Sequence, residues 1–121
     1  MSAKERTVDH WLEDIVQWGA RIESYLVGLS QNEFEADEKT QDAVIRCIEC
    51  IGEASKHIIS YKVETGLEMD VADFQDALWA RNRLAHGYFD VELSRIWITA
   101  TSSVPALVTK VVSIISARQA Q

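Results

Sequence analysis

The chain has 121 residues and a mass of 13.7 kDa, which suits one small domain spanning residues 1–121. Apolar residues make up 47% of the chain, enough to bury a core and to exclude general disorder. The net charge of −7 disfavours indiscriminate binding to nucleic acid. We find no continuous apolar run near the roughly 20 residues that span a bilayer, and no leader-like N-terminus. We therefore expect a cytoplasmic protein with no membrane partner.

The charge is unevenly distributed along the chain. Residues 1–76 hold 17 acidic and 7 basic side chains, whereas residues 77–121 hold 2 acidic and 5 basic ones. A local positive patch on an acidic protein could hold a phosphate group selectively. The C-terminal third is therefore the place to look for a phosphate site.

Apolar side chains recur at three- and four-residue steps, which predicts helices. The first predicted helix covers about residues 6–30, and the polar stretch 30–37 is predicted to be a loop. The second predicted helix covers about residues 38–61, with Asp37 or Thr40 as its N-terminal cap. A more polar stripe on this helix consists of Arg46, Cys50, Glu53 and His57.

The third predicted helix has Asp70 as its cap and ends near His86, because Gly87 can adopt the left-handed conformation past a helix end. Pro105 interrupts the last apolar pattern, and either kinks one long helix or begins a new one. No stretch alternates with period two, so we predict an all-α bundle of four to five helices. The buried face of the third helix is predicted to consist of Val71, Phe74, Ala77, Leu78 and Trp79.

Cys47 and Cys50 form a C-x-x-C pair, a pattern found in redox centres and in zinc sites. A redox pair usually opens a helix after a strand, whereas this pair lies inside a predicted helix. Zinc would need two further ligands, and the three His residues are distant in sequence. We interpret the pair as two buried thiols, expect no metal or other cofactor, and assign no catalytic role to His10 or His57.

Charged and titratable side chains crowd the predicted end of the third helix, in the segment Arg81-Asn82-Arg83-Leu84-Ala85-His86-Gly87-Tyr88. An imidazole titrates near neutral pH and can move a proton. A guanidinium stays charged and can hold phosphate oxygens with two parallel hydrogen bonds. Together these groups could deprotonate a ribose 2′-hydroxyl and stabilise the charge that develops on the neighbouring phosphate, without a metal.

Spacing alone leaves two interpretations of this segment open. Arg81 and His86 are five residues apart, about 140° beyond a full turn, so they do not share one helical face. His86 could turn back at the helix end, or a two-fold dimer could bring two copies of each residue into one cleft. The other interpretation is a charged helix end, with the Arg residues near the negative end of the helix dipole.

The segment resembles the R-x4-H-x-Y motif of HepT toxins, a branch of the HEPN superfamily of helical ribonuclease-like domains. Residues 89–97, 44–49 and 51–54 are also similar to HepT, and the resemblance covers about residues 40–110. The Arg and His spacing is a weak match alone, but it becomes specific when it is joined to the Tyr and to the Gly-Glu-Ala of the second predicted helix. The Cys pair is not part of this motif.

The resemblance implies a HEPN-type bundle that forms homodimers and cleaves RNA. Arg81 and His86 of both copies would be the catalytic residues of one shared cleft. Asn82 would support them, and Glu53 and Arg46 would brace the site from the second predicted helix. No cofactor is implied.

The resemblance further implies a toxin paired with a small MntA-type nucleotidyltransferase as antitoxin, with hetero-oligomers of the two proteins left open. That transferase would move AMP from ATP to Tyr88 and so silence the toxin. An alternative is a non-catalytic helical module that binds nucleotide or phosphate for a partner nucleotidyltransferase. A plainer alternative is a scaffold bundle in which the motif has no activity.

Overall fold

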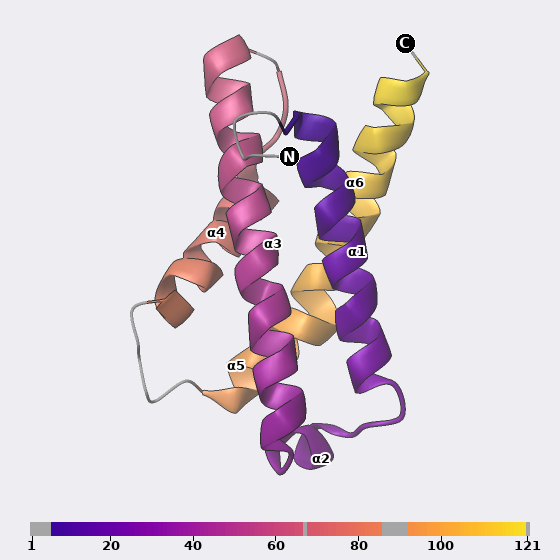
Figure 1. Cartoon of the computed structure of the whole chain (residues 1–121), viewed down its shortest axis with the longest axis vertical. Coiled ribbons are helices and arrows are strands. Elements are labelled where there is room, and N and C mark those ends of the chain that lie inside the picture. The colour runs from indigo at the N-terminus through magenta and orange to yellow at the C-terminus, as the bar shows by residue number, and fades with distance from the viewer. Residues whose placement is uncertain (1–5, 67, 86–91, 121) are drawn as a thin grey trace.

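The computed structural model describes residues 6–66, 68–85 and 92–120, and every regular element in these residues is a helix (Figure 1). The all-α fold class predicted from apolar spacing is therefore confirmed. A π-helical segment, η2 (Thr99–Ser103), joins two of the helices. The α-helices are α1 (Val8–Leu26), α2 (Gln31–Glu35), α3 (Glu38–Thr65), α4 (Ala72–Ala85), α5 (Leu93–Ile98) and α6 (Val104–Gln119).

Helix α3 is the central element of the bundle. Helices α1 and α4 both pack against it, and α6 packs against α1 (Figure 1). The short helices α2 and α5 contact each other at the end of the bundle opposite to the start of α1. Every helix contributes to the core, whose buried apolar residues are Val8, Leu12, Ile15, Ile22, Leu26, Phe34, Val44, Cys47, Ile48, Ile51, Ala54, Ile58, Phe74, Ile96, Ala100, Val104, Leu107 and Val111.

The N-terminus of α1 is closed by a reciprocal cap between Thr7 and His10. The backbone N–H of His10 donates to the Thr7 hydroxyl at 3.4 Å, and the backbone N–H of Thr7 donates to His10 Nδ1 at 3.2 Å. This cap satisfies two amide groups that have no partner within the helix. His10, which was given no role from sequence, therefore has a structural one.

The loop predicted over residues 30–37 is wrong in part, because α2 occupies its centre. Ser30 and Glu33 cap this short helix reciprocally, with the hydroxyl of Ser30 accepting from the Glu33 N–H at 3.2 Å and Glu33 Oε1 accepting from the Ser30 N–H at 3.0 Å. Phe34 is fully buried and anchors the helix to the core. The Ser-x-x-Glu spacing is a helix-start signal that a reading by apolar periodicity alone overlooks.

Helix α3 begins where it was predicted and ends one turn later. Asp37 is the N-cap, accepting from the Thr40 backbone N–H at 3.2 Å and from the Thr40 hydroxyl at 2.7 Å. These two bonds hold the pKa of Asp37 below its ordinary value. Gly66 ends the helix in the left-handed conformation at φ 69°, where a side chain would be strained.

Pro105 lies in the first turn of α6, which begins at Val104 directly after η2, so the predicted new helix after Ser103 is present, while the backbone stays helical from Leu93 to Gln119. Pro105 has no N–H to donate to the preceding turn. The backbone adjusts through η2 immediately before it, where the Val104 N–H donates to the Thr99 carbonyl five residues back. The helix thereby passes the proline without ending.

Trp79 was predicted to be buried with Phe74, and this prediction is wrong. Phe74 is fully buried, but 59% of Trp79 is exposed. Five residues on a helix turn about 140° past a full revolution, so Trp79 faces away from the side of α4 that packs on α3. The exposed indole of Trp79 lines a pocket.

The segment Leu93–Gln119 is long and apolar enough, by length and composition, to cross a membrane. Polar residues interrupt this segment, so no continuous apolar run marks it in the sequence. A single such helix is weak evidence, because core helices of soluble proteins satisfy the same criterion. Ile96, Val104 and Leu107 of this segment are buried in the bundle.

Candidate functional site

Arg81 lies on the side of α4 that faces α3, where two neighbours hold its guanidinium. Arg81 Nη2 is 3.4 Å from Glu53 Oε2 on α3, and Arg81 Nη1 donates to Asn82 Oδ1 at 3.1 Å. The Arg81 side chain is 33% exposed and that of Glu53 is 41% exposed. The guanidinium is therefore fixed in place but open to solvent on one side, as a phosphate-binding group must be.

Gly52 explains how α4 approaches α3 so closely at this point. A Cβ atom at Gly52 would lie 2.1 Å from Cβ of Arg81 and 3.0 Å from the carbonyl oxygen of Ala77. Any side chain here would push α4 away and move Arg81 from Glu53. Glycine inside a helix costs about 1 kcal/mol relative to alanine, so its presence in the middle of α3 was a signal available from sequence.

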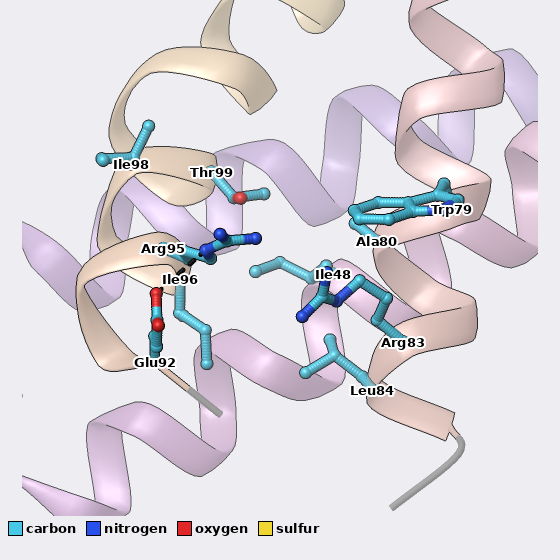
Figure 2. A pocket seen from close by; sticks show the side chains of 10 residues that line it. All are labelled: Ile48, Trp79, Ala80, Arg83, Leu84, Glu92, Arg95, Ile96, Ile98 and Thr99. Carbon is cyan, nitrogen blue, oxygen red and sulfur yellow. Dashed lines mark hydrogen bonds and ion pairs between the residues drawn. The ribbon is translucent and has the colours of Figure 1, made fainter. Parts of the chain in front are cut away.

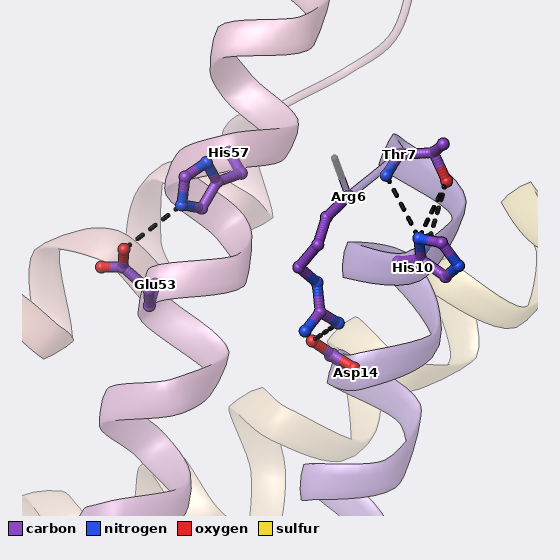
Figure 3. A network of polar contacts seen from close by, with 6 residues as sticks. All are labelled: Arg6, Thr7, His10, Asp14, Glu53 and His57. Carbon is purple, nitrogen blue, oxygen red and sulfur yellow. Dashed lines mark hydrogen bonds and ion pairs between the residues drawn. The ribbon is translucent and has the colours of Figure 1, made fainter. Parts of the chain in front are cut away.

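A row of contacts continues from Glu53 along α3 to α1. His57 Nε2 is 3.3 Å from Glu53 Oε1 (Figure 3). The His57 ring stacks on Trp11 of α1, with ring centroids 4.0 Å apart and planes inclined by 5°. The guanidinium of Arg6 covers Trp11 at 4.4 Å and also pairs with Asp14. Arg81 is thus connected, side chain by side chain, to the N-terminal end of α1.

The predicted brace from the second helix is present for one of its two residues. Glu53 contacts Arg81 directly. Arg46 makes no ion pair with either of them within the described part of the chain. Glu53 and Asn82, both expected at the site from the sequence, are therefore neighbours of Arg81. The stack between Trp11 and His57 was not expected.

Two predicted site residues, His86 and Tyr88, lie outside the described residues. The predicted helix end at Gly87 lies there too. The structure describes α4 as far as Ala85, one residue before His86. The proposed pairing of Arg81 with His86, and the modification site at Tyr88, therefore stay predictions.

The two cysteines are free thiols on α3, as interpreted from sequence. Cys47 is buried and Cys50 is half-buried. Burial raises the pKa of both thiols, which disfavours the reactive thiolate form. Within residues 6–66, 68–85 and 92–120, no cluster of three or more His, Cys, Asp or Glu side chains could hold a metal ion.

The fold and the site define a class of protein: a small helical bundle that presents a tethered, partly exposed arginine where its fourth helix crosses the central one. Comparison with known proteins specifies the class further. Residues 17–114 match the family model described as "Ribonuclease HepT-like". The chain therefore belongs to the HepT-like ribonuclease family, as the R-x4-H-x-Y resemblance predicted.

Several curated proteins are similar to the chain over most of its length. The "Probable ribonuclease HepT" of Thermococcus cleftensis is 34% identical over 103 residues, which cover 85% of this chain and 91% of that protein. "Putative RNase MJ1216" of Methanocaldococcus jannaschii is 29% identical over 85% of this chain and 83% of its own length. No solved structure matches the chain. The family supports a ribonuclease-type function.

Proposed function

We propose that the chain is a metal-independent endoribonuclease that acts as a homodimer and serves as the toxin of a HEPN/MNT toxin–antitoxin module. The family match over residues 17–114 carries this proposal. The accessible, tethered guanidinium of Arg81 supports it, because cleavage of a phosphodiester needs a fixed cation beside the reacting phosphate.

In the proposed reaction, His86 accepts the proton of a ribose 2′-hydroxyl. The 2′-oxygen attacks the adjacent phosphorus, and the bond to the 5′-oxygen of the next nucleotide breaks. The leaving 5′-oxygen takes up a proton, and a 2′,3′-cyclic phosphate remains. Arg81 stabilises the negative charge that develops on the phosphate, while Asn82 holds Arg81 through their hydrogen bond.

The spacing of the two proposed catalytic residues supports the homodimer. Arg81 and His86 differ by about 140° in direction if the helix continues, so one α4 does not aim both at one phosphate. A two-fold axis near this helix would place Arg81 of one copy and His86 of the other in a shared cleft.

Regulation is proposed to act on Tyr88 through an MntA-type nucleotidyltransferase partner. The Tyr88 phenol oxygen attacks the α-phosphorus of ATP, and pyrophosphate leaves. The attached AMP adds a negative charge and a bulky nucleoside two residues from His86, which would compete with RNA for the same cations. Tyr88→Phe should remain toxic but gain no AMP when it is incubated with the transferase and ATP, as measured by intact mass.

The proposed activity is tested by incubating the purified protein with RNA in the presence of a chelator. We expect cleavage that leaves 2′,3′-cyclic phosphate ends and that Arg81→Ala and His86→Ala each abolish. Lys39→Ala, a substitution of an exposed basic residue on α3, serves as the control and should retain activity. Absence of cleavage by the folded protein would instead support the alternative of a non-catalytic, phosphate-binding module.

A further inference from the structure

A pocket of about 330 Å³ lies between α4 and α5 (Figure 2). Its floor is apolar and consists of Ile48, Leu84 and Ile96. Trp79 and Arg83 of α4 form one wall. Glu92 and Arg95 form the opposite wall, at the start of α5. We call this the α4–α5 pocket.

The α4 wall exposes a large aromatic surface. Trp79 is 59% exposed, and the guanidinium of Arg83 lies 4.8 Å from the centre of its ring. Exposed aromatic side chains next to cations are the surfaces on which unpaired nucleobases stack, because each base has an apolar face and a charged phosphate beside it.

The charge of the pocket suits a phosphate. Figure 2 shows the guanidinium groups of Arg83 and Arg95 pointing into the pocket from opposite walls. Glu92 contacts Nε of Arg95 at 2.9 Å, which orients that side chain. Among the described residues that line the pocket, two side chains are cationic and one is a carboxylate, on a protein whose net charge is −7.

The pocket is also close to the proposed chemistry along the chain. Its two walls come from the last turns of α4 and the start of α5. These two segments flank residues 86–91, which include His86 and Tyr88. Two residues lie between Arg83 and His86, so even a fully extended chain keeps their Cα atoms within about 11 Å of each other. One nucleotide step is enough to extend from such a pocket to a phosphate held near His86.

We propose that the α4–α5 pocket binds one unpaired base of single-stranded RNA, with Trp79 stacked on the base and Arg83 and Arg95 contacting the adjoining phosphate. The inference rests on the proposed ribonuclease function, since it assigns the pocket to the same substrate. It adds a preference for unpaired RNA, because a base within a duplex is not available for stacking.

The test measures binding separately from cleavage. A short, fluorescently labelled oligonucleotide with 2′-O-methyl riboses lacks the attacking hydroxyl, so its affinity can be measured by anisotropy whether or not the protein is a nuclease. We expect Trp79→Ala and Arg83→Gln each to weaken binding about tenfold. An oligonucleotide made of abasic sugar phosphates should bind the wild-type protein and Trp79→Ala equally.

Helix α1 offers a matched control. Arg21 is exposed and stacks over Trp18 at 4.5 Å, so Arg21→Gln removes the same kind of cation from the same kind of stack outside the pocket. Its affinity should equal that of the wild type. Circular dichroism and sedimentation of each variant report folding and assembly, and Arg83→Gln carries the test if Trp79→Ala does not fold.

Three results would overturn the inference. The first is equal loss of affinity in Arg21→Gln and Arg83→Gln, which would show only a general charge effect. The second is a Trp79→Ala protein that turns from dimer to monomer, which would make the pocket a contact between copies. The third is no binding of the oligonucleotide by wild-type protein. RNA cleavage that persists in any of these cases leaves the proposed function standing without its base pocket.

Discussion

Gly52 on α3 lies directly against Arg81 on α4, so closely that a Cβ atom on the glycine would stand 2.1 Å from Cβ of the arginine. The neighbouring Glu53 uses this proximity to reach the guanidinium at 3.4 Å. Gly52 therefore allows α4 to approach α3 closely, and Glu53 holds the guanidinium of Arg81 in place. The adjacent Gly52 and Glu53 thus each have a direct structural reason.

Gly52→Ala should disturb the site and the packing together. Overpacking of a close helix contact costs about 1–3 kcal/mol of unfolding free energy, which denaturant titration measures. Because Arg81 must move, RNA cleavage per folded molecule should fall as well. Gly19→Ala is the control, since its Cβ would lie 2.6 Å from Val108 Cγ2 on α6, far along the chain from Arg81. It should lose stability but keep its activity per folded molecule. Equal specific activities in both variants would contradict the assignment.

Glu53→Gln should lower turnover more than it lowers stability. The exchange keeps the size of the side chain and removes the charge that holds Arg81. Both partners are more than 30% exposed, so the ion pair contributes less than about 1 kcal/mol to unfolding free energy. We expect a reduced kcat, because Glu53 acts by positioning Arg81. Glu53→Asp, which restores a carboxylate, should recover part of the activity.

A double-mutant cycle with Arg81 separates positioning from a general effect of charge. If Glu53 works through Arg81, adding Glu53→Gln to Arg81→Ala changes neither the remaining activity nor the stability further. Additive losses would show that Glu53 acts independently. Glu23→Gln, which removes an exposed carboxylate of α1, should behave like the wild type.

His57 makes two contacts that different substitutions can separate. His57→Phe keeps an aromatic ring on Trp11 but removes the contact with Glu53, whereas His57→Ala removes both. Aromatic stacking contributes about 0.5–1.5 kcal/mol, so His57→Ala should unfold at lower denaturant concentration than His57→Phe. Both should reduce cleavage to a similar extent if Glu53 needs His57 for its orientation. Full activity in His57→Phe would limit His57 to a packing function.

The sequence predicts features that depend on neighbouring residues better than features that depend on contacts between distant segments. Repeating apolar positions predicted the long helices, and local polar residues predicted Asp37 as a cap. The helix α2 was missed because its signal is a four-residue cap rather than a periodic pattern. Trp79 was misplaced because an apolar side chain shows no preference in sequence between a core and a pocket wall.

The candidate site divides in the same way. The proposed catalytic segment could be recognised in the sequence, because Arg81 and Asn82 are adjacent to each other. Glu53 was found only through family resemblance, because 27 residues lie between it and Arg81 and spacing in sequence cannot relate two helices. The stack of Trp11 on His57 joins helices that are further apart still, and no local pattern indicates it.

Acid should weaken the contact between α1 and α6. Arg118 donates to both carboxylate oxygens of Asp9, at 2.6 and 3.3 Å, and these bonds hold the pKa of Asp9 below its ordinary value of 3.8. Because the folded protein binds this proton less readily than the unfolded chain, the contribution to stability is complete above about pH 4 to 5 and is lost as the pH falls through the lowered pKa. Stability should therefore decline in that acidic range.

Asp9→Asn tests this directly. At about pH 7 it should reduce the unfolding free energy by less than about 1 kcal/mol, since the pair is exposed and screened by salt. The difference from wild type should shrink as the pH falls through the lowered pKa of Asp9, where the wild-type carboxylate also becomes protonated. Urea titrations across this range measure it, with Glu23→Gln as the control for net charge. A difference that stays constant with pH would mean that Asp9 acts through packing and that its charge is unimportant.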